Sequence, residues 1–433
     1  MRDTFLRSRV FFFIASVFFI SGINEYVVLP TSWLYVRSLG GTIIFLGIVL
    51  AIPNITSLLF SAPIGLISDK FRCPRAIVVA SSVMALCGSL IYSIPVSKYC
   101  PLLGRVFLGI SIASEGVIIG AVSRSTDEDE RAKAFLILEG LFSLGCGVGP
   151  LVAAIFTFQV NILGWQINAG NSAIFVMLFV WAILTILSFY LPSNFGNYED
   201  LDREDESIVA KGDAKSVLNA AAVQNSSSNS YEYSQILCLF YQMFLSWFFA
   251  GVAIFYTPLL AMELLHLDEV HVKLLFTNGT LGLLMLYLAL YIATEYFDER
   301  RLLLFAISLQ IVPIFLLFIF GLLWSSAMAK ELSYLLIIYI CLGISYVGYP
   351  LACSLLSKAT PQDQASFYQG LCVTFLNIGV IGGRLIPSFT FTKISTVVFS
   401  IGLGFLWTLG LVWYCFVYQG LPAAKNHVEN EKS

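Results

Sequence analysis

Long apolar runs separated by short polar stretches repeat along nearly the whole chain of 433 residues. Each run has about the 20 residues that an α-helix needs to cross ~30 Å of hydrocarbon. The runs are continuous and do not alternate in ~10-residue segments, which argues against a membrane β-barrel. The pattern predicts twelve membrane helices, at residues 10–36, 42–66, 76–96, 99–122, 134–158, 170–191, 236–264, 272–293, 302–324, 332–356, 367–392 and 394–418.

Composition supports the same class of protein. The chain is 58% hydrophobic and only 12% charged, whereas a soluble protein carries about 25% charged residues. We therefore expect an all-α, multi-pass membrane protein that acts as a monomer in the lipid bilayer. The net charge of −3 gives no indication of nucleic-acid binding, and the nine cysteines include no Cys-x-x-Cys pair. With no phosphate-binding loop, Gly-x-Ser-x-Gly or HExxH motif, we expect no enzyme activity, metal or cofactor.

A single long polar segment divides the runs into two sets of six. Its acidic start and its run of Asn and Ser predict a flexible linker. Lys and Arg are concentrated in alternate loops, which places both termini in the cytoplasm. The predicted organisation is a cytoplasmic N-terminus at 1–9, six-helix halves at 10–191 and 236–418, the linker at 192–235 and a cytoplasmic tail at 419–433.

The two halves are internal repeats of one another. A single offset along the chain aligns Arg124 with Lys358, Gly145 with Gly379 and Gly149 with Gly383. A slightly smaller offset places Asp69 on Glu295, so the charged stretch after the second run has a degenerate copy in the second half. Parallel repeats of this kind are typical of transporters whose substrate site lies between the halves, near the middle of the membrane.

The densest charge between two runs lies in the stretch 65–75, interpreted as a very short loop. Gly65 would allow two helices to approach closely, and Asp69 would lie near the N-terminal end of a following helix. Three basic residues would hold the loop on the cytoplasmic side: Lys70, Arg72 and Arg75. One interpretation is a conformational latch formed by all five residues. The other is a charged loop that only obeys the positive-inside rule.

This stretch resembles the loop between helices 2 and 3 of the major facilitator superfamily, Gly-x-x-x-Asp-Arg/Lys-x-Gly-Arg/Lys-Arg/Lys. The chain keeps Gly65, Asp69 and Lys70 and lacks the second Gly, with Cys73-Pro74 in that region. The resemblance implies two six-helix halves, with helices 1, 4, 7 and 10 around a central cavity. It also implies a hinge and seal in helix 5, at the positions of Gly145, Gly149 and Pro150.

Ionisable residues inside membrane helices are costly, so each is a functional candidate. Glu25 and Arg105 lie at similar depths on helices that line the cavity in the superfamily. They either bind substrate or form a permanent ion pair. The offset that aligns Arg124 with Lys358 places Tyr339 at the position of Arg105, so the second half supplies no matching charge. Arg384 replaces Pro150 in the helix-11 copy. It either attracts an anion or gates the pathway, or it pairs with a carboxylate or caps a helix end.

Three further acidic residues are candidates for protonation: Glu115, Glu139 and Glu263. For Glu115 and Glu139 the alternative is an ion pair with a loop arginine such as Arg124. Glu263 ends the predicted helix 7 and is also a candidate partner for Arg384.

Blocks such as 103–110, 342–350 and 369–387 also resemble the lysosomal facilitator family linked to late-infantile neuronal ceroid lipofuscinosis, the family of major facilitator superfamily domain-containing protein 8. Plant vacuolar phosphate carriers with an SPX domain are the next relatives. This resemblance implies a pathway for chloride or phosphate in a lysosomal or other endomembrane, with Arg105 and Arg384 as its charges. The segment Tyr198–Leu201 has the form read by sorting adaptors. No acidic dileucine signal precedes the first helix, so the plasma membrane stays an open location.

We therefore expect a secondary transporter of a small solute, an anion such as chloride or phosphate, that works by alternating access. A channel-like anion pathway and a non-transporting sensor or scaffold are the alternatives.

Overall fold

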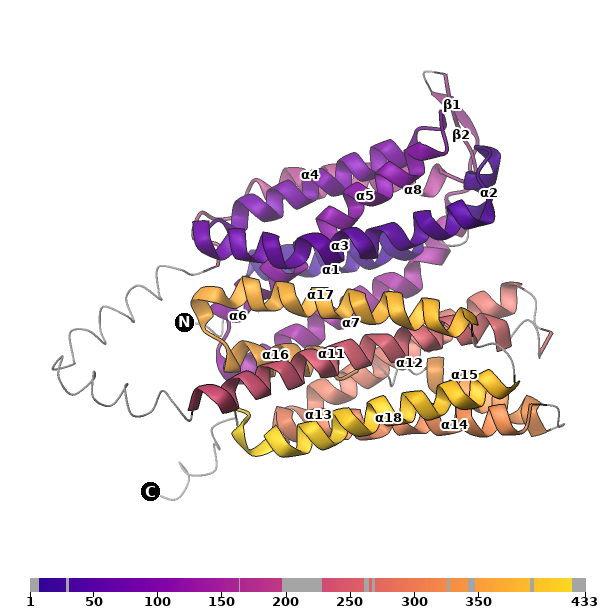
Figure 1. Ribbon diagram of the computed structural model, residues 1–433. Helices are drawn as coiled ribbons and strands as arrows, with labels where there is room; N and C mark the ends of the chain where they lie inside the picture. Colours follow the sequence, from indigo (N-terminus) through magenta and orange to yellow (C-terminus); the bar gives the residue numbers. More distant parts are fainter. Residues whose placement is uncertain are drawn as a thin grey trace.

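The computed structural model describes residues 8–28, 31–162, 164–196, 228–260, 265–266, 269–324, 328–341, 347–389 and 393–422. Its long helices lie side by side in two packed sets (Figure 1). The turn at Lys70–Arg75 marks one end of the bundle, called the basic end below. The short hairpin β1–β2 marks the opposite end, called the hairpin end.

Each of the twelve predicted runs contains one helix or two successive helices. The first half consists of α1 (Arg9–Tyr26), α2 (Ser32–Ser38), α3 (Ile43–Phe71), α4 (Pro74–Ser93), α5 (Tyr99–Ile112), α6 (Glu115–Ser125), α7 (Glu128–Ile155) and α8 (Ser172–Ser188). The second half consists of α11 (Ser228–Leu259), α12 (Glu269–Ala293), α13 (Glu299–Leu309), α14 (Ile311–Leu322), α15 (Met328–Cys341), α16 (Tyr349–Ala359), α17 (Ala365–Leu385) and α18 (Lys393–Val417). Helix α11 begins inside the segment predicted as linker. Three short 3₁₀ turns follow or precede helices of this half, at Gln362–Gln364, Ile386–Phe389 and Tyr418–Gly420.

Nine helices within the described ranges are long and apolar enough to cross a membrane, and two shorter apolar ones accompany them. Local sequence sets several of their ends: Ser8 caps α1 through its Oγ, which accepts from the backbone N–H of Phe11 at 3.1 Å, and Thr42 caps α3 in the same way. Within the described ranges, the exception to the all-α prediction is the antiparallel hairpin of β1 (Val160–Ile162) and β2 (Trp165–Ile167).

The internal repeat predicts which helices pack in equivalent ways. A methyl group at Gly145 of α7 would overlap the backbone of Phe19 and Ile23 in α1. At the repeat-related Gly379 of α17, it would overlap the backbone of Phe244 and Phe248 in α11. The same close approach therefore joins α1 to α7 in the first half and α11 to α17 in the second half.

The prediction of a loop from residue 65 to 75 is wrong in its extent. Helix α3 continues to Phe71, so Gly65 and Asp69 lie in the last turns of the helix. Only Arg72 and Cys73 connect it to α4. Arg72 has a left-handed backbone, with φ of 48°, and the N–H of Cys73 donates to the carbonyl of Ser68 at 3.1 Å. This is a helix C-cap of the kind usually built with glycine.

Candidate transport pathway and its closure at the basic end

Asp69 joins the two halves at the basic end. Its Oδ2 accepts from the backbone N–H of Phe367, in the first turn of α17, at 2.7 Å. Its Oδ1 accepts from Nη1 of Arg124 in α6 at 3.3 Å. Asp69 therefore lies at a helix N-terminus, as predicted, but the helix belongs to the other half and is not the one that follows directly. A carboxylate there is favoured by the helix dipole and by free N–H groups.

Arg124 is the centre of this contact, and its side chain is only 1% exposed. Besides Asp69, it binds the carbonyl of Gln362 through Nη1 at 3.2 Å and Oγ of Ser366 through Nη2 at 2.9 Å. Its Nε donates to the carbonyl of Gly196, just beyond the end of α8, at 2.9 Å. One guanidinium therefore ties three parts of the chain together. We refer to Asp69, Arg124, Gln362, Ser366 and Phe367 as the Asp69 cluster.

Ser366 fits between two glycines of the first half. A methyl group at Gly120 of α6 would lie 2.7 Å from Cα of Ser366. A methyl group at Gly65 of α3 would overlap its carbonyl oxygen. The backbones approach so closely that neither position has room for a side chain.

The three basic residues predicted with Asp69 lie apart from the Asp69 cluster. Lys70 and Arg72 are exposed at the end of α3, and the ammonium of Lys70 lies 5.7 Å from the ring of Phe71. Arg75 donates to the carbonyl of Phe189, after α8 of its own half, at 2.8 Å. The structure thus separates the predicted latch into Gly65 and Asp69, which contact α17, and a basic surface formed by the other three residues.

The second half has a weaker counterpart. Glu295, which the smaller repeat offset aligns with Asp69, accepts from Nζ of Lys133 in α7 at 3.1 Å. Lys133 corresponds to Phe367 under the offset that aligns Arg124 with Lys358. Both side chains of the Lys133–Glu295 pair are open to solvent, at 22% and 49% exposure. Lys358 instead binds Glu299 of its own half at 2.8 Å, with Ser354 on the second carboxylate oxygen.

Further contacts between the halves at the basic end were not predicted from the sequence. Nη1 of Arg131 in α7 donates to the carbonyl and Oγ of Ser357 in α16, at 3.3 and 3.2 Å. Gln362 accepts from Ser123 at 3.4 Å. The signal available was the repeat itself, because Ser123 aligns with Ser357 and Arg124 with Lys358 in an otherwise apolar chain.

Two arginines lie far from this closure, toward the hairpin end. Arg105 in α5 is 4% exposed, and its Nε and Nη1 have no hydrogen-bond partner. Nε of Arg384 in α17 is likewise buried without a partner. Arg105 is within electrostatic range of Arg384, Tyr92 and Glu25. Among the described residues no ion pair joins either arginine to a carboxylate, so the predicted alternative of a permanent Glu25–Arg105 bridge is wrong for this conformation.

Glu115 and Glu139 lie deeper in the first half. Glu139 in α7 is 6% exposed, and Glu115 begins α6. Among the described contacts no ion pair joins either acid to Arg124, the partner named as the alternative. Both acids lie within electrostatic range of Tyr349, which the second half contributes.

The predicted hinge lies in an unbroken helix. Helix α7 continues through Pro150 to Ile155, and Gly149 packs on the backbone of α1 at Ile23 and Val27. The glycines therefore set a close helix pair, and a hinge at Pro150 stays a prediction. Glu263, the side chain of Tyr339 and the segment Tyr198–Leu201 lie outside the described residues.

The geometry describes two six-helix repeats that meet around buried charges and close at one end. The sequence profile of the Major Facilitator Superfamily matches residues 14–383. The chain belongs to the Major Facilitator Superfamily. It is a superfamily transporter, and the twelve-helix fold predicted from its apolar runs is confirmed.

Relatives of this superfamily transporter are distant. It is 23% identical over 389 residues to the class H tetracycline resistance protein of Pasteurella multocida, covering 86% of this chain and 84% of that protein. The class B tetracycline resistance protein of Escherichia coli is 25% identical over 381 residues, with the same coverage.

Solved structures agree in fold. The proton:xylose symporter XylE superposes with a TM-score of 0.72 at 13% identity, covering 96% of both chains. The human organic anion transporter MFSD10 gives 0.66 at 14% identity, covering 94% of this chain and 100% of the other. The narrower resemblance to the lysosomal ceroid-lipofuscinosis family, and a lysosomal location, stay predictions.

Proposed function

We propose that this superfamily transporter moves a small anion, such as chloride or phosphate, by alternating access, and that Arg105 and Arg384 bind it. The supporting observation is that these two guanidinium groups come from opposite halves and lie within electrostatic range of each other. Nε and Nη1 of Arg105 and Nε of Arg384 are buried N–H donors without partners. An anion held between them would contact both halves at once.

Arg105 and Arg384 are like charges whose buried N–H donors lack acceptors. Guanidinium groups in a membrane interior repel one another and are poorly hydrated. Each unsatisfied buried donor costs about 1–3 kcal/mol. An anion between them would remove the repulsion and accept several N–H donors at once. Glu25 lies near enough to reduce the net positive charge without neutralising the pair.

The Asp69 cluster would act as the latch that keeps the basic end closed while the anion site is occupied from the hairpin end. Helix α17 carries both features, with Phe367 in its first turn and Arg384 in its last. These two residues are about 25 Å apart along a helix that rises 1.5 Å per residue. Motion of one helix therefore links the latch to the anion site. The positive-inside rule assigns the basic end to the cytoplasm.

The test is anion flux into proteoliposomes that contain the purified protein, with chloride and phosphate supplied separately. We expect saturable uptake, reduced about tenfold or more in Arg105→Gln and in Arg384→Gln, which corresponds to a loss of at least about 1.4 kcal/mol. Arg301→Gln is the matched control, because Arg301 is 67% exposed at the basic end. Equal uptake by all four proteins would contradict the assignment.

The same experiment separates the alternatives. Large currents that follow voltage without saturation would favour a channel-like pathway. No flux of either anion by a folded protein would favour a sensor or scaffold. The direct hydrogen bonds that close the halves at the basic end favour a transporter, because a channel needs both ends open together.

A further inference from the structure

Tyr92 carries a buried hydroxyl close to the proposed anion site. The residue is the second-last of α4, toward the hairpin end, and is 2% exposed. Its hydroxyl has no hydrogen-bond partner. The O–H of a buried tyrosine usually has a partner, because an unmade hydrogen bond in the protein interior is costly. The hydroxyl of Tyr92 is therefore available to a bound solute.

The position of Tyr92 is fixed by contacts that do not use this hydroxyl. Oη of Tyr35 in α2 donates to the carbonyl of Tyr92 at 2.8 Å, and the centroids of the two rings are 5.4 Å apart. Nδ2 of Asn171, the residue before α8, donates to the carbonyl of Ser93 at 3.0 Å. Carbonyl groups at a helix C-terminus need partners of this kind. The end of α4 is thus held by two other elements, and the ring of Tyr92 is placed with it.

The same part of α4 lies directly against α5, next to Arg105. A methyl group at Gly104 of α5 would lie 2.8 Å from Cβ of Tyr92 and 2.6 Å from the carbonyl oxygen of Gly88. Arg105 directly follows Gly104, and its guanidinium lies within electrostatic range of the phenol. Nε and Nη1 of that guanidinium are buried donors without partners. The close helix pair therefore brings one O–H and two N–H donors, none of them with a partner, into the same region.

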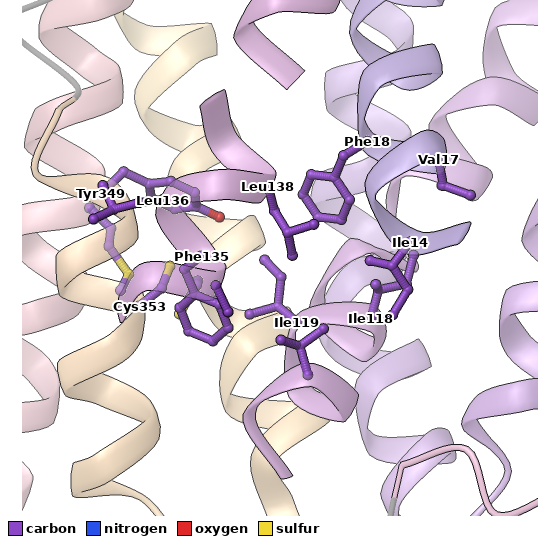
Figure 2. Packing of buried hydrophobic residues seen from close by; sticks show 14 of the residues in the cluster. Ile14, Val17, Phe18, Ile118, Ile119, Phe135, Leu136, Leu138, Tyr349 and Cys353 are labelled. Atoms are coloured by element: carbon purple, nitrogen blue, oxygen red, sulfur yellow. The ribbon is translucent and has the colours of Figure 1, made fainter. Parts of the chain in front are cut away.

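Tyr349, the first residue of α16, offers a comparison, because its hydroxyl is also buried without a partner. It lines a small cavity together with Phe135, Leu138 and Cys353 (Figure 2). The ionisable groups that act on it within the described chain are two glutamates and two thiols. Acids repel an anion when they are ionised, so an unpartnered hydroxyl alone does not indicate an anion site. The guanidinium beside it distinguishes Tyr92.

We propose that the hydroxyl of Tyr92 is a further ligand of the transported anion, and that it makes the site prefer an oxyanion such as phosphate over chloride. The donors of Tyr92, Arg105 and Arg384 come from α4, α5 and α17, and an oxyanion offers a separate oxygen atom to each. A hydrogen bond from a hydroxyl to a charged oxygen is short and strong. The phenol oxygen also accepts a hydrogen bond from the P–OH group of monobasic phosphate, which a halide lacks. This inference rests on the proposed function and specifies its substrate class.

The test is the concentration dependence of phosphate and chloride uptake by proteoliposomes that contain the full-length protein. Tyr92→Phe keeps the ring and removes only the hydroxyl. We expect it to raise the KM for phosphate about tenfold, the effect of losing one hydrogen bond to a charged group. The KM for chloride should rise much less, so that the preference for phosphate falls. Tyr349→Phe is the matched control, because it removes an equally buried, unpartnered hydroxyl away from the arginines, and should leave both KM values unchanged.

A thermal melt separates a ligand of the anion from a structural residue. The hydroxyl of Tyr92 makes no hydrogen bond within the protein, so Tyr92→Phe should keep or raise the melting temperature. Tyr35→Phe should lower it, because the carbonyl of Tyr92 then loses its donor. Phosphate should raise the melting temperature of the unmodified protein and of Tyr349→Phe more than that of Tyr92→Phe, since a ligand stabilises the state that binds it.

An unchanged KM for phosphate in Tyr92→Phe would overturn the inference, and reduced uptake in Arg105→Gln and Arg384→Gln would then leave the proposed function intact. An equal rise of both KM values in Tyr92→Phe would overturn the preference for an oxyanion. A lower melting temperature with an unchanged KM would make Tyr92 a structural residue. No uptake of either anion by the folded, unmodified protein would overturn the proposed function and this inference together.

Discussion

Asp69 and Glu295 occupy corresponding places in the two halves, and each contacts a residue of the opposite half that the repeat also relates. Asp69 binds the backbone N–H of Phe367, and Glu295 binds the side chain of Lys133. The first contact is buried and shared with Arg124, whereas the second is partly open to solvent. The same arrangement thus yields two contacts of unequal strength.

The difference follows from the different partners of Arg124 and of Lys358, which the repeat aligns with it. In the first half Arg124 faces Asp69 and reaches across to α17. In the second half Lys358 turns to Glu299 of its own half. A buried charge that binds across the halves controls their separation, whereas one that binds within its own half only stabilises that half. We therefore expect closure at the basic end to depend on the Asp69 cluster far more than on the Lys133–Glu295 pair.

Truncating Arg124 and its repeat-related counterpart Lys358 should give the largest difference between the two sites. Arg124→Ala removes the guanidinium that pairs with the buried Asp69 carboxylate, which costs about 3–5 kcal/mol, and should open the basic end. Lys358→Ala should instead lower the melting temperature of the protein and leave the basic end closed. Dye-to-dye energy transfer at the basic end and a thermal melt distinguish the two effects. Opening in both variants would show that the two sites act alike.

The glycines around Ser366 test the same contact through shape. Gly120→Ala places a methyl group 2.7 Å from Cα of Ser366. We expect closure to weaken by about 1–3 kcal/mol, as in other overpacked sites. Gly140→Ala is the matched control, because nothing lies within 4 Å of that position in α7; it should be neutral or stabilising. An equal effect in both variants would mean that helix propensity, and not the close approach, decides the result.

Lys133→Met should have a smaller effect, because exposed ion pairs contribute about 0.2–1 kcal/mol. The effect should also shrink as salt is raised, since exposed charges are screened. Closure measured in low and high salt for this variant and for the unmodified protein checks both points. A loss of closure as large as that in Arg124→Ala would show that the two contacts are equivalent, which contradicts the account.

A substitution at Arg72 should have the smallest effect, and it should raise stability instead of lowering it. A non-glycine residue in the left-handed conformation costs roughly 1–2 kcal/mol. Arg72→Gly should therefore raise the free energy of unfolding by about 1 kcal/mol and leave closure unaltered. A stability lower than that of the unmodified protein would show that the exposed guanidinium makes a contact worth more than the strain.

The sequence predicts the architecture well because each membrane helix corresponds to an apolar run of its own. It also yields the repeat, and the repeat relates the Gly145–α1 contact to the Gly379–α11 contact. The partners of Asp69 could not be predicted, since Phe367 contributes only a backbone N–H and lies 298 residues away. The sequence also cannot show that buried N–H donors of Arg105 and Arg384 lack partners. Only the packed helices show that Arg105 and Glu25 stay apart.

Separation of the halves in Asp69→Asn, measured by energy transfer between dyes at Lys70 and Tyr296 with Glu295→Gln alongside, tests the central claim most directly. Asp69→Asn keeps the shape and removes the charge that binds Arg124 and the N-terminus of α17. We predict that it shifts the basic end toward the open state and impairs transport with substrate preference unchanged. Glu295→Gln should leave closure within about 1 kcal/mol of the unmodified protein. Equal closure in the two variants, or a changed substrate preference in Asp69→Asn, would contradict the account.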